Sequence, residues 1–196
     1  MMNTYISILR GINVGGKNKV RMVELRSLYE NIGFKNVQSY IQSGNVVFLT
    51  KNIEPKHLES QIVKEIQVAF GYEVSVIVRT LDVWEATVHN NPFTKDTEKE
   101  DKFLHVTFLS NPIALESIDT EKIMEKKRSG EEVEFSKNAV YLYCPIGYGR
   151  TKLNNNFFER KLKIRATTRN WKTTKKLLKM AENLQKLRRK EKTNEK

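Results

Sequence analysis

Residues 37–50 have the sequence VQSYIQSGNVVFLT, in which two short runs rich in β-branched and aromatic residues flank Gln42 and Ser43. Such runs on either side of a tight turn are typical of paired antiparallel strands, here 37–41 and 44–50. This hairpin lies at the centre of the pattern that the N-terminal half forms.

Helix and strand patterns extend outward from the hairpin. Before it, an apolar strand at 5–10 precedes a helix at 23–32. After it, Pro55 begins a helix that Gly71 ends, and alternating valines predict a strand at 74–78. The resulting order, β-α-β-β-α-β, is that of the ferredoxin-like fold.

The C-terminal half repeats most of this order. A strand is predicted at 103–109, a helix after Pro112, and a second hairpin at 133–135 and 140–143. A helix at 157–164 follows, and Thr168 is expected to cap a long final helix.

The sequence thus predicts an α+β fold with two ferredoxin-like subdomains, the second ending in a long basic helix instead of a strand. The expected bounds are 1–80 for the first subdomain and 81–184 for the second with its helix. Residues 185–196 are expected to form a basic, disordered tail.

The composition excludes several classes of protein. Hydrophobic residues make up 39% of the chain, which fits a folded globular protein. No apolar run approaches the ~20 residues that span a bilayer, and the N-terminus lacks the basic region of a signal peptide. A single cysteine, Cys144, excludes an internal disulfide and a multi-cysteine zinc site. We expect a cytoplasmic protein with no membrane partner and no cofactor.

The net charge of +12 is concentrated in one part of the chain. Residues 160–196 contain 15 Lys and Arg against three acidic residues, whereas residues 1–159 contain 20 of each sign. A basic segment on a neutral body indicates a polyanionic partner. The alternative is a solvated helix face followed by a frayed tail.

The first candidate site is the loop at residues 10–19, RGINVGGKNK, which follows a strand. Glycines permit positive φ, and exposed amides among cations suit an anion. The G-x-x-x-x-G-K spacing matches part of a P-loop, but Asn18 replaces the magnesium-binding hydroxyl and the helix starts too late. The loop therefore predicts a metal-free anion site, or else a packing and turn role, for Arg10, Asn13, Gly15, Gly16, Lys17 and Lys19.

Two further candidate clusters follow from short polar stretches. Ser43 and Asn45 supply hydrogen-bond groups beside the hairpin turn, although an Asx-type turn that fixes the strand register is the favoured explanation for them. We expect this turn and the glycine loop to lie at opposite ends of the sheet. Thr168, Arg169 and Asn170 are expected at a helix N-terminus, where an anion binds favourably.

The histidines give no metal site. His57, His89 and His105 show no ligand spacing, and His105 is interpreted as a structural histidine within a strand. Ser43 has no adjacent base in the sequence that would make it a nucleophile.

Three stretches resemble a bacterial family known only as domain of unknown function 1697. They are LRGINVGGKNKV at 9–20, YIQSGNVVF at 40–48 and ATTRNW at 166–171. The resemblance covers about residues 3–184 and implies two ferredoxin-like halves packed as one unit. It implies no reaction.

The sequence leaves three functional hypotheses open. The leading one is a binding module for a phosphate-bearing ligand or nucleic acid, acting through the loop 10–19 and the basic C-terminal helix. The second is an enzyme that acts on a small polar metabolite between the halves, with Ser43, Asn45 or His105 involved. The third is a protein with a purely structural, interaction role.

Overall fold

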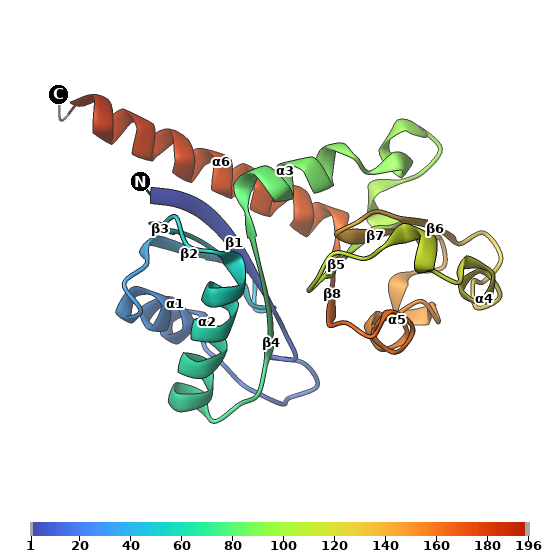
Figure 1. Cartoon of the computed structure of the whole chain (residues 1–196), viewed down its shortest axis with the longest axis horizontal. Coiled ribbons are helices and arrows are strands. Elements are labelled where there is room, and N and C mark those ends of the chain that lie inside the picture. Colours follow the sequence, from blue (N-terminus) through green and yellow to red (C-terminus); the bar gives the residue numbers. More distant parts are fainter. Residues whose placement is uncertain (1, 195–196) are drawn as a thin grey trace. The chain divides into compact units, whose positions relative to one another are not determined.

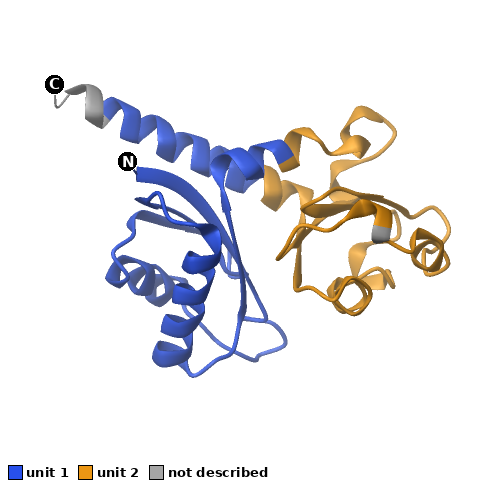
Figure 2. Ribbon diagram, viewed as in Figure 1, with its two compact units in different colours: residues 1–86, 176–196 blue, residues 87–175 orange. Residues whose placement is uncertain are grey.

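In the computed structural model, which describes residues 2–194, the chain forms two α+β units (Figure 2). The first unit contains residues up to 86 together with those from 176 onward, and the second contains residues 87–175. The division therefore differs from the expected bounds 1–80 and 81–184, because the C-terminal part of the last helix belongs to the first unit.

The first unit contains an antiparallel sheet with strand order β2-β3-β1-β4 and two helices between the strands (Figure 1). This is the strand order that the split β-α-β-β-α-β pattern predicts. The elements are β1 (Met2–Arg10), α1 (Met22–Asn31), β2 (Lys35–Tyr40), β3 (Asn45–Lys51), α2 (Pro55–Phe70) and β4 (Ser75–Thr80).

Helix α2 shows why the sequence signals at its ends were informative. Pro55 occupies the first helical turn, where its missing N–H costs no hydrogen bond. Gly71 ends the helix in the left-handed conformation, at φ 72°, and its amide donates to the Gln67 carbonyl at 2.9 Å.

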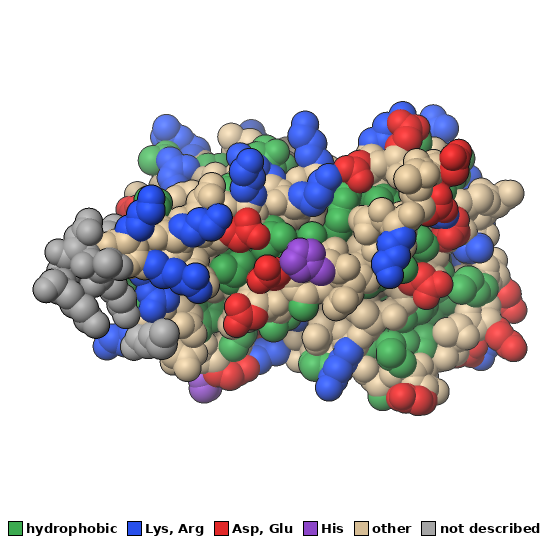
Figure 3. All heavy atoms as spheres, turned by 90° about the horizontal axis from the view of Figure 1, so that it is seen from above, with side chains coloured by type: hydrophobic (Ala, Val, Ile, Leu, Met, Phe, Trp, Pro, Cys, Tyr) green, Lys and Arg blue, Asp and Glu red, His purple; other side chains and the backbone are tan. Residues whose placement is uncertain are grey.

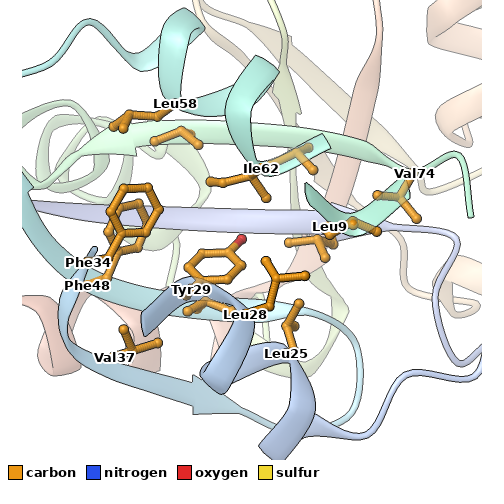
Figure 4. Packing of buried hydrophobic residues seen from close by; sticks show 14 of the residues in the cluster. Leu9, Leu25, Leu28, Tyr29, Phe34, Val37, Phe48, Leu58, Ile62 and Val74 are labelled. Carbon is orange, nitrogen blue, oxygen red and sulfur yellow. The ribbon is translucent and has the colours of Figure 1, made fainter. Parts of the chain in front are cut away.

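One hydrophobic core lies between this sheet and the helices α1 and α2, and Figure 4 shows its packing. The rings of Phe34 and Phe48 stack with centroids 4.4 Å apart, and Tyr29 meets Phe48 edge-on at 5.4 Å. The Tyr29 hydroxyl is satisfied inside this core by the Ser7 hydroxyl at 2.8 Å. Such satisfaction is what a buried polar atom requires.

The other face of the same sheet is buried as well. Ile6, Ile8, Val47 and Ile77 have no exposed surface. Helix α6 (Trp171–Asn194) runs along the side of the sheet away from α1 and α2 in Figure 1. Between residues 176 and 190, its buried apolar residues are Leu177, Leu178, Ala181 and Leu184.

The second unit repeats the fold of the first. Its sheet has the order β6-β7-β5-β8, and every neighbouring pair is antiparallel. The prediction of two ferredoxin-like subdomains is thereby confirmed. The elements are β5 (Leu104–Leu109), α4 (Thr120–Met124), β6 (Glu132–Phe135), β7 (Ala139–Tyr143), α5 (Asn155–Leu162) and β8 (Ala166–Asn170).

The units are connected by α3 (Leu81–His89) and, further along the chain, by α6. Short 3-10 helices complete the second unit: η1 (Pro92–Lys95), η2 (Asp101–Phe103), η3 (Leu115–Ser117) and η4 (Tyr148–Arg150). Within the described residues, no helix combines the length and apolarity that crossing a membrane requires.

The expectation that the second subdomain ends in a helix instead of a strand is wrong. Residues 166–170 form β8, which pairs with β5 so that Thr168 lies opposite Thr107. Threonine is β-branched and favours strands over helices. Helix α6 instead starts after Asn170, whose Oδ1 accepts a hydrogen bond from the Thr173 amide at 2.8 Å.

The C-terminal segment also differs from the expected disordered tail. Helix α6 continues without a break through Asn194, and only residues 195–196 of the expected tail lie outside the described residues. The segment after Leu184 is rich in Lys, Arg and Glu, which are good helix formers, so helix propensity persists after the apolar stripe fades.

Candidate functional site

The glycine loop and the hairpin turn lie at the same end of the first sheet. β1 and β2 are both antiparallel to β3 and therefore run in the same direction. Their C-terminal ends lie at the same end of the sheet. The Leu9 amide donates to the Gly44 carbonyl at 2.7 Å. The expectation that loop and turn lie at opposite ends is therefore wrong: it overlooked that β1 and β2 run in the same direction.

Asn13 joins the loop to the turn. Its Nδ2 donates to the carbonyl oxygens of Val20 and Gln42, both at 2.8 Å, while its Oδ1 accepts from the Val20 amide at 2.9 Å. Its φ of 53° is one that asparagine tolerates better than most residues. Asn13 therefore fixes the loop through its own side chain, which is a different role from contacting a ligand.

The tip of the loop is a small hairpin. The Lys17 amide donates to the Val14 carbonyl at 3.1 Å, and Gly15 and Gly16 between them have φ of 58° and 76°. Positive φ at both central residues is the mark of a type I′ turn, which glycine permits. Lys17 and Lys19 are exposed on this hairpin, whereas Arg10 at its base is half-buried.

The helix that follows the glycine loop starts three residues after Lys19. Helix α1 begins at Met22 and Arg21 precedes it as the N-cap residue. The late helix start is as the sequence indicated, and the loop does not have the phosphate-binding geometry of a nucleotide hydrolase. The groups that the loop offers to an anion are its exposed side chains and tip amides.

The turn at 42–45 is packed tightly against the loop base. A Cβ on Gly44 would lie 2.6 Å from the Leu9 Cβ and 2.9 Å from the Ile12 Cδ1. Asn45 is fully buried, and its Nδ2 donates to the Tyr40 carbonyl and to the Ser43 Oγ, each at 3.0 Å. These contacts favour the turn-fixing interpretation of Ser43 and Asn45.

In the second unit, Thr168 lies in a network that the sequence did not reveal. The Thr168 Oγ1 donates to Asn155 Oδ1 at 2.6 Å and accepts from the Tyr148 hydroxyl at 2.9 Å. It also forms a hydrogen bond with the Thr107 Oγ1, which lies 2.7 Å away. These partners lie 13 to 61 positions away in the sequence, so no local pattern points to them.

His105 lies beside this network and not in a metal site. Its ring stacks on Tyr148 with centroids 4.8 Å apart, and its Nδ1 lies 3.1 Å from the Phe103 carbonyl. Burial lowers the pKa of His105, which favours the neutral ring at pH 7. Among the residues that the structure describes, no three His, Cys, Asp or Glu side chains gather as a metal site would require.

Arg169 and Asn170 differ from Thr168 in their surroundings. The Arg169 guanidinium donates to the Thr168 carbonyl at 3.0 Å, and burial lowers the pKa of Arg169 to about 10. Asn170 caps the start of α6. Because Thr168 and Arg169 belong to a strand, the helix N-terminus expected at all three residues is limited to Asn170.

Helix α6 presents a stripe of exposed lysines opposite its buried face. Successive members are separated by four, three, seven and four residues, a spacing that keeps them on one side of a helix. Figure 3 shows Lys and Arg side chains gathered over the region where α6 runs. We call the following residues the lysine stripe: Lys172, Lys176, Lys179, Lys186 and Lys190.

The stripe differs from neighbouring lysines in its partners. Lys175, which lies beside it, forms an ion pair with Asp101. No member of the stripe has an ion pair with another described residue, and Lys176 Nζ lies 5.9 Å from the centroid of the Tyr40 ring. The stripe is therefore a row of exposed cations for which the described side chains supply no ion-pair partner.

A pocket of about 450 Å³ lies at the opposite end of β1 from the glycine loop. Arg188 and Arg189 of α6 line it, with Asp82 on the α3 side. Thr4 is 2% exposed, and its Oγ1 has no hydrogen-bond partner in the described part of the chain. A buried hydroxyl of this kind is expected to have an unseen partner, such as a water molecule.

The family model for proteins of unknown function called DUF1697 matches residues 2–141. The chain belongs to this family. A solved structure, the conserved bacterial protein SP0830 from Streptococcus pneumoniae, is similar at 28% identity with a TM-score of 0.69. The alignment covers 92% of this chain and 99% of that one. The curated proteins include no match.

The match to DUF1697 covers two of the three stretches that carried the resemblance, 9–20 and 40–48, and these two form one surface in the first unit. The third stretch, 166–171, lies beyond residue 141, and all of it belongs to the second unit. The sequence could indicate these motifs but not which of them converge.

Proposed function

We propose that this protein binds single-stranded nucleic acid through the lysine stripe of α6 and the glycine loop of the first unit. The observation that carries the proposal is the stripe itself, a row of exposed lysines along one helix with no ion pair to another described residue. From Lys176 to Lys190 the row extends over roughly 21 Å at 1.5 Å per residue. That length suits several consecutive phosphates of an extended strand better than one small anion.

The glycine loop adds to the same binding surface. The contact between Lys176 and Tyr40 brings α6 next to the end of β2, where the hairpin turn begins. Because Asn13 ties the loop to that turn, Lys17 and Lys19 belong to the same region of the first unit. Val14 and Ile41, which are 65% and 51% exposed, offer apolar contacts for bases.

The expected binding is independent of base sequence. Lysine ammonium groups recognise phosphates as point charges and do not read base edges. Neutralised phosphates release counterions, so affinity falls steeply as salt rises. The surface thus suits a general nucleic-acid binder and not a sequence reader.

The alternative of an enzyme on a small polar metabolite remains a hypothesis. Ser43 and Asn45 take part in the turn hydrogen bonds, and the His105 Nδ1 lies beside a backbone carbonyl. These contacts account for the three residues without catalysis, so no observation favours a reaction.

Fluorescence anisotropy with labelled single-stranded RNA of about 15 nucleotides tests the proposal, since site sizes reach about 16 nucleotides. The variant Lys176→Gln/Lys179→Gln/Lys186→Gln should weaken binding at least tenfold at 50 mM salt, because roughly two or more phosphates are no longer neutralised. The matched control Lys35→Gln/Lys51→Gln/Lys64→Gln removes three exposed lysines elsewhere on the first unit and should bind as the wild type. Equal loss of affinity in both variants would contradict the assigned surface.

A further inference from the structure

The second unit contains a separate pocket of about 710 Å³ whose wall is strongly basic. Six cationic side chains line it, with Thr151, Asn154 and Phe157 as the other residues. The six cations come from three segments: the turn after α4, the end of η4 with the stretch that follows it, and the second half of α5. We call them the basic pocket: Lys126, Arg128, Arg150, Lys152, Arg160 and Lys161.

Local hydrogen bonds hold the segments of the basic pocket in place. The Glu131 Oε2 accepts from the Arg128 amide at 2.9 Å, and the Glu131 amide donates to the Arg128 carbonyl at 3.0 Å. The Thr151 Oγ1 accepts from the Leu153 amide at 3.0 Å, and the Asn154 Oδ1 accepts from the Phe157 amide at 3.1 Å. The backbone that carries the cations is therefore well defined on both sides of the pocket.

No acidic residue lines the pocket, and none of its six cations has an ion pair with a described residue. Glu131 is only 1% exposed. Glu159, the acid next to Arg160, accepts from the Ala166 amide through its Oε1 at 2.9 Å. Asp119 is near enough to Lys161 for the charge of Lys161 to add to the lowering of the Asp119 pKa, which hydrogen bonds with Lys122 dominate. The six gathered cations still repel one another, so a bound anion reduces this repulsion.

We propose that the basic pocket binds a compact ligand that carries a chain of phosphate groups. Its volume lies within the ~300–1,000 Å³ typical of small-molecule sites. Arginine forms paired hydrogen bonds with phosphate oxygens, and three of the six cations are arginines. A single phosphate does not use six cations, whereas a triphosphate spreads several negative charges over them.

The ligand class comprises inorganic oligophosphate and the triphosphate group of a nucleotide. Phe157 is 5% exposed, so its ring forms part of the pocket wall and offers little face for stacking a base. The phosphate chain is consequently the recognised group. The pocket contains no residue of the lysine stripe or the glycine loop, so this inference goes beyond the proposed function.

Isothermal titration calorimetry of the full chain with inorganic triphosphate, in magnesium-free buffer at 150 mM salt, tests the inference. We expect saturable binding of one triphosphate per chain. The variant Arg150→Gln/Arg160→Gln should weaken it by about 100-fold, since removing each charged hydrogen-bonding group is expected to cost roughly a factor of ten. The control Lys137→Gln/Arg165→Gln removes two exposed cations of the second unit outside the pocket and should leave binding unchanged.

Two further arms separate the possible outcomes. ATP that binds as tightly as triphosphate, or more tightly, supports recognition of the phosphate chain in a nucleotide; ATP that binds more weakly supports the inorganic ligand. The variant Lys176→Gln/Lys179→Gln/Lys186→Gln should retain triphosphate binding, so failure of the proposed function and of this inference are distinguishable. Absence of saturable binding, or an equal decrease of affinity in the control, overturns the inference. A further result would overturn the inference: Arg150→Gln/Arg160→Gln abolishes RNA binding, and triphosphate does not compete with RNA. These arginines would then bind RNA and not triphosphate.

Discussion

The Nδ2 of Asn13 and the carbonyl oxygen of Gln42 lie 2.8 Å apart, and their hydrogen bond joins the loop after β1 to the turn after β2. The residues are 29 positions apart in sequence. This contact joins two motifs that are separate in the sequence into one surface, and it places the loop lysines relative to the hairpin.

Replacing Asn13 with glycine tests the side-chain hydrogen bonds alone, because the backbone conformation can stay the same. Glycine accepts the positive φ of this position, so Asn13→Gly removes three side-chain hydrogen bonds without adding strain. We expect a decrease of about 2 kcal/mol in the free energy of unfolding, measured in urea. Stability equal to the wild type would show that the loop is not held by this side chain.

The close packing at Gly44 predicts that substitution by alanine lowers the free energy of unfolding by more than the positive φ alone would. Gly44→Ala should cost about 2–4 kcal/mol, because the new Cβ meets Leu9 and Ile12 in addition to the unfavourable φ. Gly15→Ala is the matched control, since its φ of 58° is similar and its Cβ meets nothing within 4 Å. It should cost about 1 kcal/mol. Equal chemical-denaturation midpoints for the two variants would contradict a packing penalty at Gly44.

The salt dependence of RNA binding should report the number of phosphates that the stripe neutralises. On a single strand, the slope of log K against log salt changes by roughly 0.7 for each phosphate that is no longer neutralised. Lys176→Gln/Lys179→Gln/Lys186→Gln should therefore reduce the slope by about 2 in anisotropy titrations between 50 and 200 mM salt. An unchanged slope would mean that these lysines do not contact phosphates.

Cys144 should behave as an inert thiol in the native protein. It is 1% exposed, and burial, with a smaller contribution from the Glu131 charge, raises the pKa of its thiol to about 12. At pH 8 a thiol reagent should label the unfolded chain rapidly and the native chain only at the rate of unfolding. Fast native labelling would contradict the burial of this side chain.

The same cysteine predicts a loss of stability in alkaline solution. Because the native state raises the pKa of Cys144 from 9.0, the native state binds more protons than the unfolded state between about pH 9 and 12. Its contribution is complete below pH 9 and decreases as pH rises. In a plot of unfolding free energy against pH, Cys144→Ala should reduce the slope in this pH range. An unchanged slope would mean that other groups cause the pH dependence.

Local signals in the sequence were sufficient to predict most of the fold. Pro55 and Gly71 act at the ends of one helix, and the turn at 42–45 lies between two patterned strands, so each signal depends only on its near neighbours. The prediction failed at strand β8 because Thr168 is suited both to a helix cap and to a strand. Only its pairing with Thr107, which is 61 residues away, decides between them.

The candidate sites were harder to predict for the same reason. The loop and the turn were recognised as motifs, but their convergence depends on strand direction in a complete sheet. The charge count did not indicate the basic pocket, because residues 1–159 contain equal numbers of basic and acidic residues. A narrower window would have indicated it: residues 150–165 contain six Lys and Arg against the single acid Glu159.

The first unit is discontinuous in sequence, since it needs residues up to 86 and those from 176 onward. During synthesis the segment that supplies α6 leaves the ribosome after the strands of both units. Until then the sheet face that carries Ile6, Ile8, Val47 and Ile77 lacks its helical cover. The half that is translated first is therefore the half that finishes folding last, and a nascent chain halted before residue 176 presents an apolar sheet to chaperones.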